Sequence, residues 1–408
     1  MKRTFLAAGG AVVTSFLGGV LVLCLCFSSN AFAAADGWAS VSDANGTPYN
    51  LTGGAGGQPV TVIDEPNLIK YAKDTTTPYI IQISGTIDVN PVAGQDTSFE
   101  INSNKTIRGI GTNPTIRGNV GFVNRGGNII IENLNITNPH AGSTYDGISL
   151  KQDIHNVFVT KCTIYDCGDG GFDITNRSNY ITVSWCKFYF NNPAPDEAHR
   201  FMCLVGHSDG YTDDIGKERV TYHHNWWANR VKERMPRVRY GLVHVYNNYY
   251  SNLETGGYCI GVGVESQLRV EGNYFNAVPN PWADYYTGNG AAGHIGWDTN
   301  NIFYNCTQPT WATNEYATIF TPPYSYKPLD DANVLPTIVP AYAGAGTPYP
   351  PHWLYTVYGD FDRDSKVEID DLKTFANYWL TDDPEADYNG DGTVDFYEFS
   401  LLAGNWMQ

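Results

Sequence analysis

Basic residues are few in this sequence: 25 Lys and Arg stand against 42 Asp and Glu, and the net charge is −17. A protein that binds nucleic acid needs a basic surface, so this balance argues against general nucleic-acid binding. Charged residues of both signs make up only 16% of the chain, against about 25% in a typical soluble domain. Hydrophobic residues reach 42%, which supplies a large core and excludes wholesale disorder.

Long apolar runs are missing after the first 35 residues, so we expect no membrane span in the mature protein. Before that point, Lys2 and Arg3 precede an apolar stretch, and Ala31-Phe-Ala33 has the small-x-small pattern of a cleavage site. We therefore predict a signal peptide over residues 1–33, cleaved after Ala33, and a secreted, periplasmic or cell-surface protein. A retained membrane anchor is the alternative.

Cysteine and histidine motifs are also sparse. None of the nine His belongs to a His-Glu-x-x-His motif, and nothing resembles a zinc site or a nucleophilic triad. Removal of the predicted signal peptide leaves six cysteines in an exported chain, where disulfides are permitted but their connectivity cannot be read. These cysteines are Cys162, Cys167, Cys186, Cys203, Cys259 and Cys306.

A short strand pattern recurs six times in the middle of the chain, with apolar and polar residues alternating and many β-branched or aromatic side chains. The copies begin at Ile129, Val157, Ile181, Val220, Val243 and Leu268. Repeats of this length predict a solenoid, here an all-β, right-handed parallel β-helix with an insertion between the third and fourth copies. An antiparallel β-sandwich is the alternative, but it would need more frequent hairpin turns.

The sixth position of each copy supports stacked coils. It reads Leu134, Cys162, Cys186, Asn225, Asn248 and Asn273. Asparagines stacked at a repeated bend can form a hydrogen-bonded ladder from coil to coil. Cys162 and Cys186 would be neighbours in that column, as a disulfide or, as we expect, as two packed thiols.

Three carboxylates occupy related positions on two successive coils. Asp146 and Asp169 each precede a glycine, 11 and 12 residues before the following strand copy, and Asp173 follows in the same coil as Asp169. Asp-Gly pairs are common in turns, but three converging carboxylates repel one another unless a cation bridges them. We therefore predict a metal site on this strip.

The next coils carry a basic run, with five Lys and Arg between Arg230 and Arg239. A basic stripe beside an acidic cluster suits an anionic substrate held by a metal and by arginines, whose planar fork fits carboxylates. A solvated, salt-bridged strip is the alternative.

The middle of the chain resembles the pectate lyases of polysaccharide lyase family 1. The matching stretches are Thr52–Gly57, Lys105–Gly111, Phe172–Thr175, Ile181–Trp185, Leu204–Asp209, Val220–Asn225 and Arg234–His244. The resemblance implies that Asp146, Asp169 and Asp173 bind calcium, that Arg234 is the catalytic base and that Arg239 holds the substrate carboxylate. Arg200 and Arg237 are further predicted substrate-binding residues.

Three departures from this family accompany the resemblance. Thr144 replaces an acidic ligand, Phe201 stands where a substrate-binding lysine is usual, and Thr160-Lys161 replaces an Asp-His pair.

The implied reaction is β-elimination on polygalacturonate: the C6 carboxylate is neutralised, the C5 proton is removed and the C4 oxygen leaves. Arginine normally keeps its proton up to about pH 12, so we expect alkaline activity. Alternatives are a glycoside hydrolase, a pectin lyase acting on methylated pectin without calcium, and a non-catalytic pectate-binding β-helix protein.

An acidic pattern is duplicated near the C-terminus, with 27 residues between Asp360 and Asp387. Oxygen ligands at positions 1, 3, 5 and 12 have the spacing of an EF-hand calcium loop, and an aromatic helix is expected after each loop. The predicted ligands are Asp360, Asp362, Asp364 and Asp371 in the first loop, and Asp387, Asn389, Asp391, Thr393 and Glu398 in the second.

This C-terminal repeat resembles a dockerin, a two-loop calcium module that attaches secreted carbohydrate-active enzymes to a cohesin. Ser365 and Glu398 depart from the dockerin pattern, so generic EF-hand pairing is the alternative. We predict four parts: a signal peptide (1–33), a β-helix (34–339), a Pro/Gly/Ala linker (340–358) and a dockerin-like α-helical module (359–408). The expected partners are pectate and a cohesin-like or cell-surface receptor, and we expect a monomer.

Overall fold

The computed structural model describes most of the chain after residue 34. The described residues are 35–89, 100–122, 126–139, 146–288, 290–326, 329–348, 359, 367–381, 386, 393–404 and 406. The predicted signal peptide lies outside them. Within them, no helix has the length and apolar character that a membrane crossing requires.

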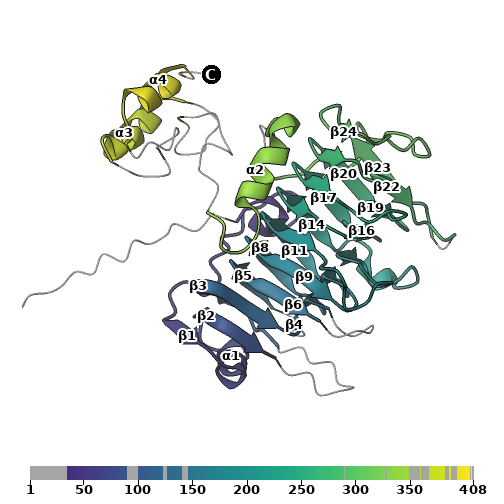
Figure 1. The fold of residues 1–408 in the computed structure, drawn as a ribbon, viewed down its shortest axis with the longest axis horizontal. Helices are drawn as coiled ribbons and strands as arrows, with labels where there is room; N and C mark the ends of the chain where they lie inside the picture. Colours follow the sequence, from purple (N-terminus) through teal and green to yellow (C-terminus); the bar gives the residue numbers. More distant parts are fainter. Residues whose placement is uncertain are drawn as a thin grey trace, which may run out of the picture. The chain divides into compact units, whose positions relative to one another are not determined.

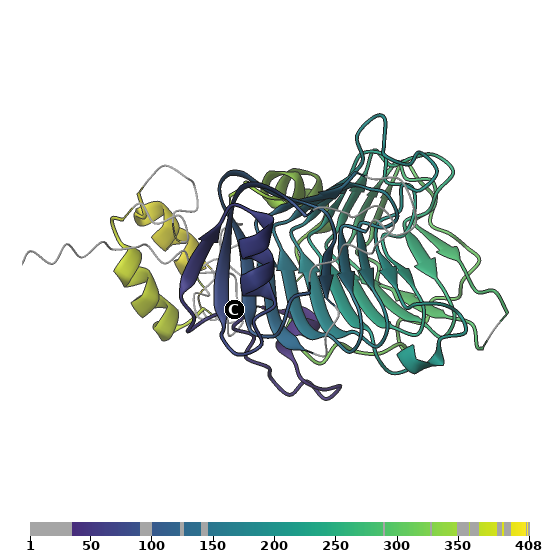
Figure 2. The same ribbon diagram turned by 90° about the horizontal axis from the view of Figure 1, so that it is seen from below.

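Parallel strands stacked coil upon coil build the main body (Figures 1 and 2). Two of its three faces belong to one sheet, which bends where a coil turns the corner, and β3 runs along both faces. The 17 strands of this sheet, within the described residues, are β1 (Pro59–Val62), β2 (Tyr79–Asp88), β3 (Lys105–Arg117), β5 (Gly127–Glu132), β6 (Asn135–Asn138), β8 (His155–Thr160), β9 (Thr163–Cys167), β11 (Asn179–Ser184), β12 (Lys187–Tyr189), β14 (Arg219–His223), β15 (Trp226–Trp227), β17 (Leu242–Tyr246), β18 (Tyr249–Ser251), β20 (Gln267–Glu271), β21 (Tyr274–Asn276), β23 (His294–Trp297) and β24 (Ile302–Tyr304).

The third face is a separate parallel sheet, which carries the candidate active site. Within the described residues its seven strands are β4 (Val120–Phe122), β7 (Ile148–Leu150), β10 (Phe172–Ile174), β13 (Leu204–Val205), β16 (Arg237–Val238), β19 (Ile260–Val262) and β22 (Trp282–Asp284). The predicted parallel β-helix is thus confirmed.

The strand register follows the sequence repeat residue by residue. The first residues of the six predicted copies are paired in one continuous row, from Ile129 through Val157 and Ile181 to Leu268. These residues are fully buried, and the row continues to Ile295 in β23. Side chains alternate across a strand, so a slip of one residue would expose this whole row, which explains why the apolar pattern specifies the register.

The predicted asparagine ladder is present inside the coils. The side-chain oxygen of Asn248 accepts the backbone N–H of Asn225 at 3.0 Å, and that of Asn273 accepts the backbone N–H of Asn248 at 2.9 Å. Asn301 adds a further step, accepting from Asn273 at 3.0 Å. Each of these buried amides is therefore satisfied by the next coil, as buried polar groups must be.

The six cysteines predicted for the mature chain are unpaired thiols, and five of them are buried. Cys162 and Cys186 pack in the ladder column as the sequence indicated, and the Cys186 thiol donates to the backbone oxygen of Ser184 at 3.3 Å. They behave as small apolar side chains within the stack.

Two helices accompany the solenoid. Helix α1 (Glu65–Ala72) begins after Asp64, whose carboxylate caps it by accepting the Asn67 N–H at 2.9 Å. Helix α2 (Leu335–Tyr342) buries Leu335 and Val339 with Tyr249 of the solenoid.

The residues after α2 also contact the solenoid. Gly344 donates to the backbone oxygen of Trp185 at 2.8 Å, and the Lys161 ammonium donates to the backbone oxygens of Tyr342 and Pro348. Residues 340–348, which we expected to begin a linker, therefore belong to α2 and to a segment bound along the solenoid. The rest of the predicted linker, 349–358, lies outside the described residues.

Two further helices lie near the C-terminus, α3 (Ile369–Tyr378) and α4 (Phe396–Gly404). Their small core repeats the 27-residue period of the sequence: Val367 corresponds to Val394 and Phe375 to Leu402. We call α3 and α4 the C-terminal helix pair.

Candidate active site

A row of outward-facing side chains crosses the seven-stranded sheet at right angles to its strands. Their chain neighbours are buried apolar residues, because successive side chains of a strand point to opposite faces. In order from β7 to β19 the row consists of Ser149, Asp173, Leu204, Arg237 and Gly261. The register thus brings a predicted metal ligand and a predicted substrate-binding arginine onto one face, two strands apart.

Asp146 joins this row from the turn before β7. Its Oδ1 accepts the backbone N–H of Gly170 at 3.1 Å, and its Oδ2 accepts the hydroxyl of Ser149 at 2.7 Å. Ile148 pairs with Phe172, which places Asp146 opposite Gly170 and one residue from Asp169, as the spacings of 11 and 12 residues indicated. The charge of Asp169 raises the pKa of both Asp146 and Asp173, so the three carboxylates share this part of the sheet.

The carboxylates of Asp146 and Asp173 face the backbone at Gly170. A Cβ atom placed on Gly170 would lie 2.7 Å from Oδ1 of Asp173 and 3.1 Å from Oδ1 of Asp146. Burial raises the pKa of Asp146 to about 6, and burial together with the Asp146 charge raises the pKa of Asp173 well above its ordinary value. Burial also raises the pKa of Asp169, while the nearby Arg234 guanidinium lowers it. Two buried acids in mutual repulsion are thus held side by side.

The donor set has the chemistry of a hard-cation site. Asp146, Asp169 and Asp173 supply carboxylate oxygens, the ligands that calcium prefers, and the repulsion between them would be relieved by a cation. Within the part of the chain that the structure describes, no three His, Cys, Asp or Glu side chains already surround one point. Asp146, Asp169 and Asp173 are the residues that would hold a hard cation here. Thr144 lies outside the described residues.

Arg234, the predicted base, lies next to this acidic strip. Its Cζ is 4.4 Å from the centre of the Phe201 ring, and its backbone oxygen accepts the N–H of Cys203 at 2.7 Å. Its charge lowers the pKa of Asp169 and of Asp173 against the larger effect of their burial. The Nε atom is buried and has no hydrogen-bond partner among the described residues. Arg234 is thus close to the carboxylates without forming an ion pair there.

Among the predicted substrate-binding residues, Arg200 is the one whose charge is most fully balanced by protein carboxylates. It is 8% exposed, its Nη2 lies 3.1 Å from Oε2 of Glu254, and its Nη1 contacts Glu197. Arg230 pairs with the same Glu197 at 2.6 Å. These two arginines and two glutamates form a partly buried network beside Phe201.

Arg239 is also paired. Its Nε donates to Oδ1 of Asp209, and its Nη1 donates to the backbone oxygen of Gly206 at 3.2 Å. The hydroxyl of Thr287 donates to the other carboxylate oxygen of Asp209. Arg239 is therefore held in place by a carboxylate that comes from the turn after β13.

Sequence reasoning missed three aromatic features of this site. The Phe201 ring covers Arg234, Tyr285 lies 4.5 Å from Cζ of Arg237, and the rings of Tyr258 and Tyr285 are 4.3 Å apart. No motif pointed to Tyr258, which lies just before β19, or to Tyr285, which directly follows β22. Phe201 was noted only as a departure from the usual lysine.

The C-terminal loops can be followed only in part. Asp360, Asp362, Asp364, Asp387, Asn389 and Asp391 lie outside the described residues. The acids at position 12, Asp371 and Glu398, are fully buried. Asp371 accepts the N–H of Glu368 at 2.9 Å, and Glu398 accepts that of Asp395 at 3.0 Å, so the two halves share the same local geometry.

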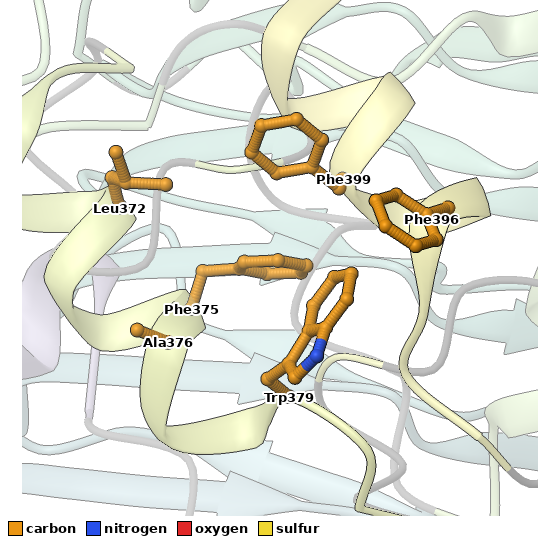
Figure 3. A pocket seen from close by; sticks show the side chains of 6 residues that line it. All are labelled: Leu372, Phe375, Ala376, Trp379, Phe396 and Phe399. Carbon is orange, nitrogen blue, oxygen red and sulfur yellow. The ribbon is translucent and has the colours of Figure 1, made fainter.

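The C-terminal helix pair encloses an apolar groove of about 330 Å³ (Figure 3). Its lining residues are Leu372, Phe375, Ala376, Trp379, Phe396 and Phe399. Phe396 is 75% exposed, which is unusual for so large an apolar side chain. Leu372 and Phe399 occupy equivalent positions of the repeat, so both halves contribute to the groove.

The sequence of this chain matches a family of known proteins. A family model described as pectate lyase matches residues 10–348. The chain belongs to the pectate lyase family. A pectate trisaccharide-lyase of Bacillus licheniformis is 32% identical over 331 residues, which cover 78% of this chain and 87% of that protein. A pectate trisaccharide-lyase of a Thermotoga species is 33% identical over 348 residues, covering 76% of this chain and 88% of the relative.

Solved pectate lyases share the solenoid. One from a Bacillus species, in complex with trigalacturonate, superposes with a TM-score of 0.59 at 29% identity and covers 77% of this chain and 99% of the other. A Bacillus subtilis pectate lyase variant superposes with a TM-score of 0.61 at 24% identity, over 76% of this chain and 96% of the other, which supports the fold. The family match ends at residue 348, the last described residue of the segment that follows α2.

Proposed function

We propose that this protein cleaves polygalacturonate by calcium-assisted β-elimination with Arg234 as the base. The observation that carries the proposal is the juxtaposition of two buried carboxylates, Asp146 and Asp173, with Arg234, which has no ion-pair partner among the described residues. The relatives named pectate trisaccharide-lyase and the neighbour in complex with trigalacturonate support the choice of substrate.

The arginines would orient a uronate unit and move its proton. Arg239 would hold the C6 carboxylate, since its guanidinium is fixed by Asp209 and Gly206. Arg234 would remove the proton from C5, after which the C4=C5 double bond forms, the C4–O bond breaks and the departing oxygen takes up a proton. The Phe201 ring shields one side of Arg234 from water, which strengthens electrostatic interactions there.

Asp146, Asp169 and Asp173 would hold the calcium ion in this proposal. When bound, calcium would neutralise the substrate carboxylate and so acidify the C5 proton. It would also relieve the repulsion between Asp146 and Asp173, which at present raises the pKa of Asp173 in addition to burial. An acidic protein could then accept a polyanionic substrate at this strip.

An absorbance assay tests this function directly. Polygalacturonate incubated with the protein and calcium should form an unsaturated product that absorbs in the ultraviolet, and a chelator should stop its formation. Full activity after chelation would refute the calcium assignment. Higher activity on methylated pectin without calcium would indicate a pectin lyase, and binding without depolymerisation would indicate a binding protein.

The C-terminal part would serve attachment after secretion. We propose that its two loops bind calcium and that the helix pair docks on a cohesin-like or cell-surface receptor. The exposed apolar groove with Phe396 and Phe399 supports a protein partner, because monomeric proteins rarely leave such residues clustered at the surface. Calcium-dependent binding of the full chain to a cohesin domain tests this part, and generic calcium binding without a partner is the alternative outcome.

A further inference from the structure

The turn that orients Arg239 is itself held by a buried carboxylate. It runs from Gly206 to Asp214, and the carboxylate of Asp209 within it binds the Arg239 guanidinium. The backbone N–H of His207 donates to Oδ2 of Asp214 at 2.9 Å. Asp214 is fully buried, so this bond fixes the turn between the two groups that accept hydrogen bonds from Arg239.

A second acid, Glu218, lies against Asp214. Glu218 is fully buried, and its backbone N–H donates to the backbone oxygen of Ser178 at 3.0 Å. Neither of its carboxyl oxygens meets an N–H or O–H donor among the described residues, and the polar group within hydrogen-bond reach is the Asp214 carboxyl. Arg177 contacts Asp214 through its backbone N–H at 2.8 Å, while its guanidinium binds Asp153. Two ionised carboxylates have no proton to share, so one acid of the pair is neutral.

The hydrogen bonds decide which of the two acids carries the proton. Both oxygens of Asp214 accept backbone N–H groups, which stabilise its charged form, whereas no such donor reaches Glu218 within the described part of the chain. Burial, followed by the charge of Asp214 and the hydrogen bond to it, raises the pKa of Glu218 well above its ordinary value, against the effect of Arg239. Glu218 is therefore the neutral acid.

Negative charges already surround this turn. The Tyr240 hydroxyl donates to the backbone oxygen of Asp209. Burial, followed by the charges of Glu265 and Asp209, raises the pKa of Tyr240, whereas Arg239 lowers it. Arg239 is thus the cation that acts on both Tyr240 and Glu218. An ionised Glu218 would add one more anion that competes with a substrate carboxylate for Arg239.

We propose that Glu218 is a positioning residue, a neutral acid that donates a hydrogen bond to Asp214 and thereby fixes the turn whose Asp209 orients Arg239. The link to substrate rests on the proposed function, whereas the protonation of Glu218 does not. The neutral form persists below the pKa of Glu218 in the folded protein and is lost as the pH rises through it. The hydrogen bond then becomes a repulsion between two buried carboxylates, which loosens the turn and weakens binding of a polyanion.

Infrared difference spectroscopy tests the proton without any substrate. The spectrum of the wild type minus that of Glu218→Gln, at neutral pH in calcium, should contain the carbonyl band of a protonated carboxylic acid. Glu132→Gln is the matched control, because Glu132 is also a buried glutamate but forms an ion pair with Arg108 at 3.0 Å, and it should give a carboxylate band. A carboxylate band from Glu218 would overturn the proposal.

Equilibrium binding of trigalacturonate tests the positioning step, in Arg234→Lys protein so that the ligand is not consumed. At neutral pH, adding Glu218→Ala should weaken binding about 10-fold, the range for one hydrogen bond. Adding Glu218→Gln should preserve the affinity, since its amide can still donate to Asp214. As the pH rises, the affinity of the protein with Glu218 should fall together with the acid band, and Glu218→Gln should lack this step.

Two results would overturn the positioning role: equal affinities of the Glu218→Ala protein and its parent, or a fall in affinity at high pH that Glu218→Gln retains. Thermal unfolding verifies that each variant is folded, and the comparison with Glu218→Gln does not depend on the alanine variant. Absence of trigalacturonate binding in every protein, the parent included, would instead contradict the proposed function. The acid band would still decide whether Glu218 is neutral.

Discussion

Arg239 and Asp209 form an ion pair in which Nε of the guanidinium donates to Oδ1 of the carboxylate. Both side chains are largely buried, with 12% and 13% of their surfaces exposed. Thr287 binds the remaining oxygen of Asp209. Asp209 thus orients Arg239 but also partly neutralises it, so a substrate carboxylate must share this arginine with a protein carboxylate.

Replacing Arg239 by alanine should impair both binding and rate. The variant loses the proposed clamp on the reacting uronate and leaves Asp209 without its cation, which adds a repulsive charge beside the substrate. We expect kcat/KM on polygalacturonate to fall at least about 10- to 100-fold, with KM raised as well as kcat lowered. Arg117→Ala is a suitable control, because Arg117 forms an exposed pair with Asp88. An unchanged KM would show that Arg239 does not hold the substrate.

Arg234→Lys should nearly abolish turnover and preserve the fold. Lysine keeps the positive charge but cannot place a nitrogen where the guanidinium lies over Phe201. Loss of a positioned base typically lowers kcat by about 100- to 10,000-fold. Initial rates of unsaturated-product formation measure the effect, and circular dichroism verifies folding. Wild-type turnover in this variant would remove Arg234 from the role of base.

The apolar repeat predicted the solenoid well because it is a property of every coil. A one-residue slip would turn each buried row outward, so the sequence alone suffices to align Ile129, Val157 and Ile181. The site depends on turns instead. Tyr258 lies just before β19 and Tyr285 directly follows β22, and no repeated spacing predicted that Tyr285 would pack on Arg237. Ion pairs such as Arg239–Asp209 join different coils, and no local pattern specifies them.

Acid should destabilise the solenoid through His244. Its Nε2 is 2.7 Å from Oε2 of Glu271 and its Nδ1 is 2.9 Å from the Tyr324 hydroxyl, an arrangement that suits neutral imidazole. Burial lowers the pKa of His244 to about 4, against about 6.5 in the unfolded chain. Between these two pH values the unfolded chain binds more protons than the folded chain. The contribution of neutral His244 to the free energy of unfolding is therefore complete above about pH 6.5 and is lost as the pH falls toward 4.

Denaturant unfolding between pH 4.5 and 7.5 measures this dependence. We expect the free energy of unfolding to fall by about 3 kcal/mol across the titration of His244. His244→Gln should flatten the acid limb, since glutamine can still donate to Glu271 and accept from Tyr324 without titrating. Identical pH profiles for the two proteins would show that another group causes the acid sensitivity.

Lys161 should act as a clip for the segment after α2. Its ammonium donates to the backbone oxygens of Tyr342 and Pro348 and to the hydroxyl of Thr347, which uses all three of its N–H bonds. Lys161→Met fills similar space but makes none of these bonds, so we expect a loss of about 1–3 kcal/mol in stability. Hydrogen exchange of residues 343–348 should rise, whereas β8 should stay protected. Unchanged exchange in the segment would show that the packing of Leu335 and Val339 holds it without the clip.

Removal of the C-terminal helix pair should leave pectate cleavage almost unchanged. Every residue assigned to the candidate active site precedes Pro348, and a truncation after Pro348 keeps the bonds from Lys161. Calorimetry should show more calcium binding by the full chain than by the truncated chain, since all the predicted EF-hand ligands follow Pro348 and the proposed ligands Asp146, Asp169 and Asp173 precede it. Thermal unfolding should resolve a calcium-dependent transition of the C-terminal part, because residues 360–408 carry 13 Asp and Glu against three Lys and Arg in a small unit. Equal calcium heats would refute the loop assignment, and a collapse of activity on truncation would show that the helix pair takes part in cleavage.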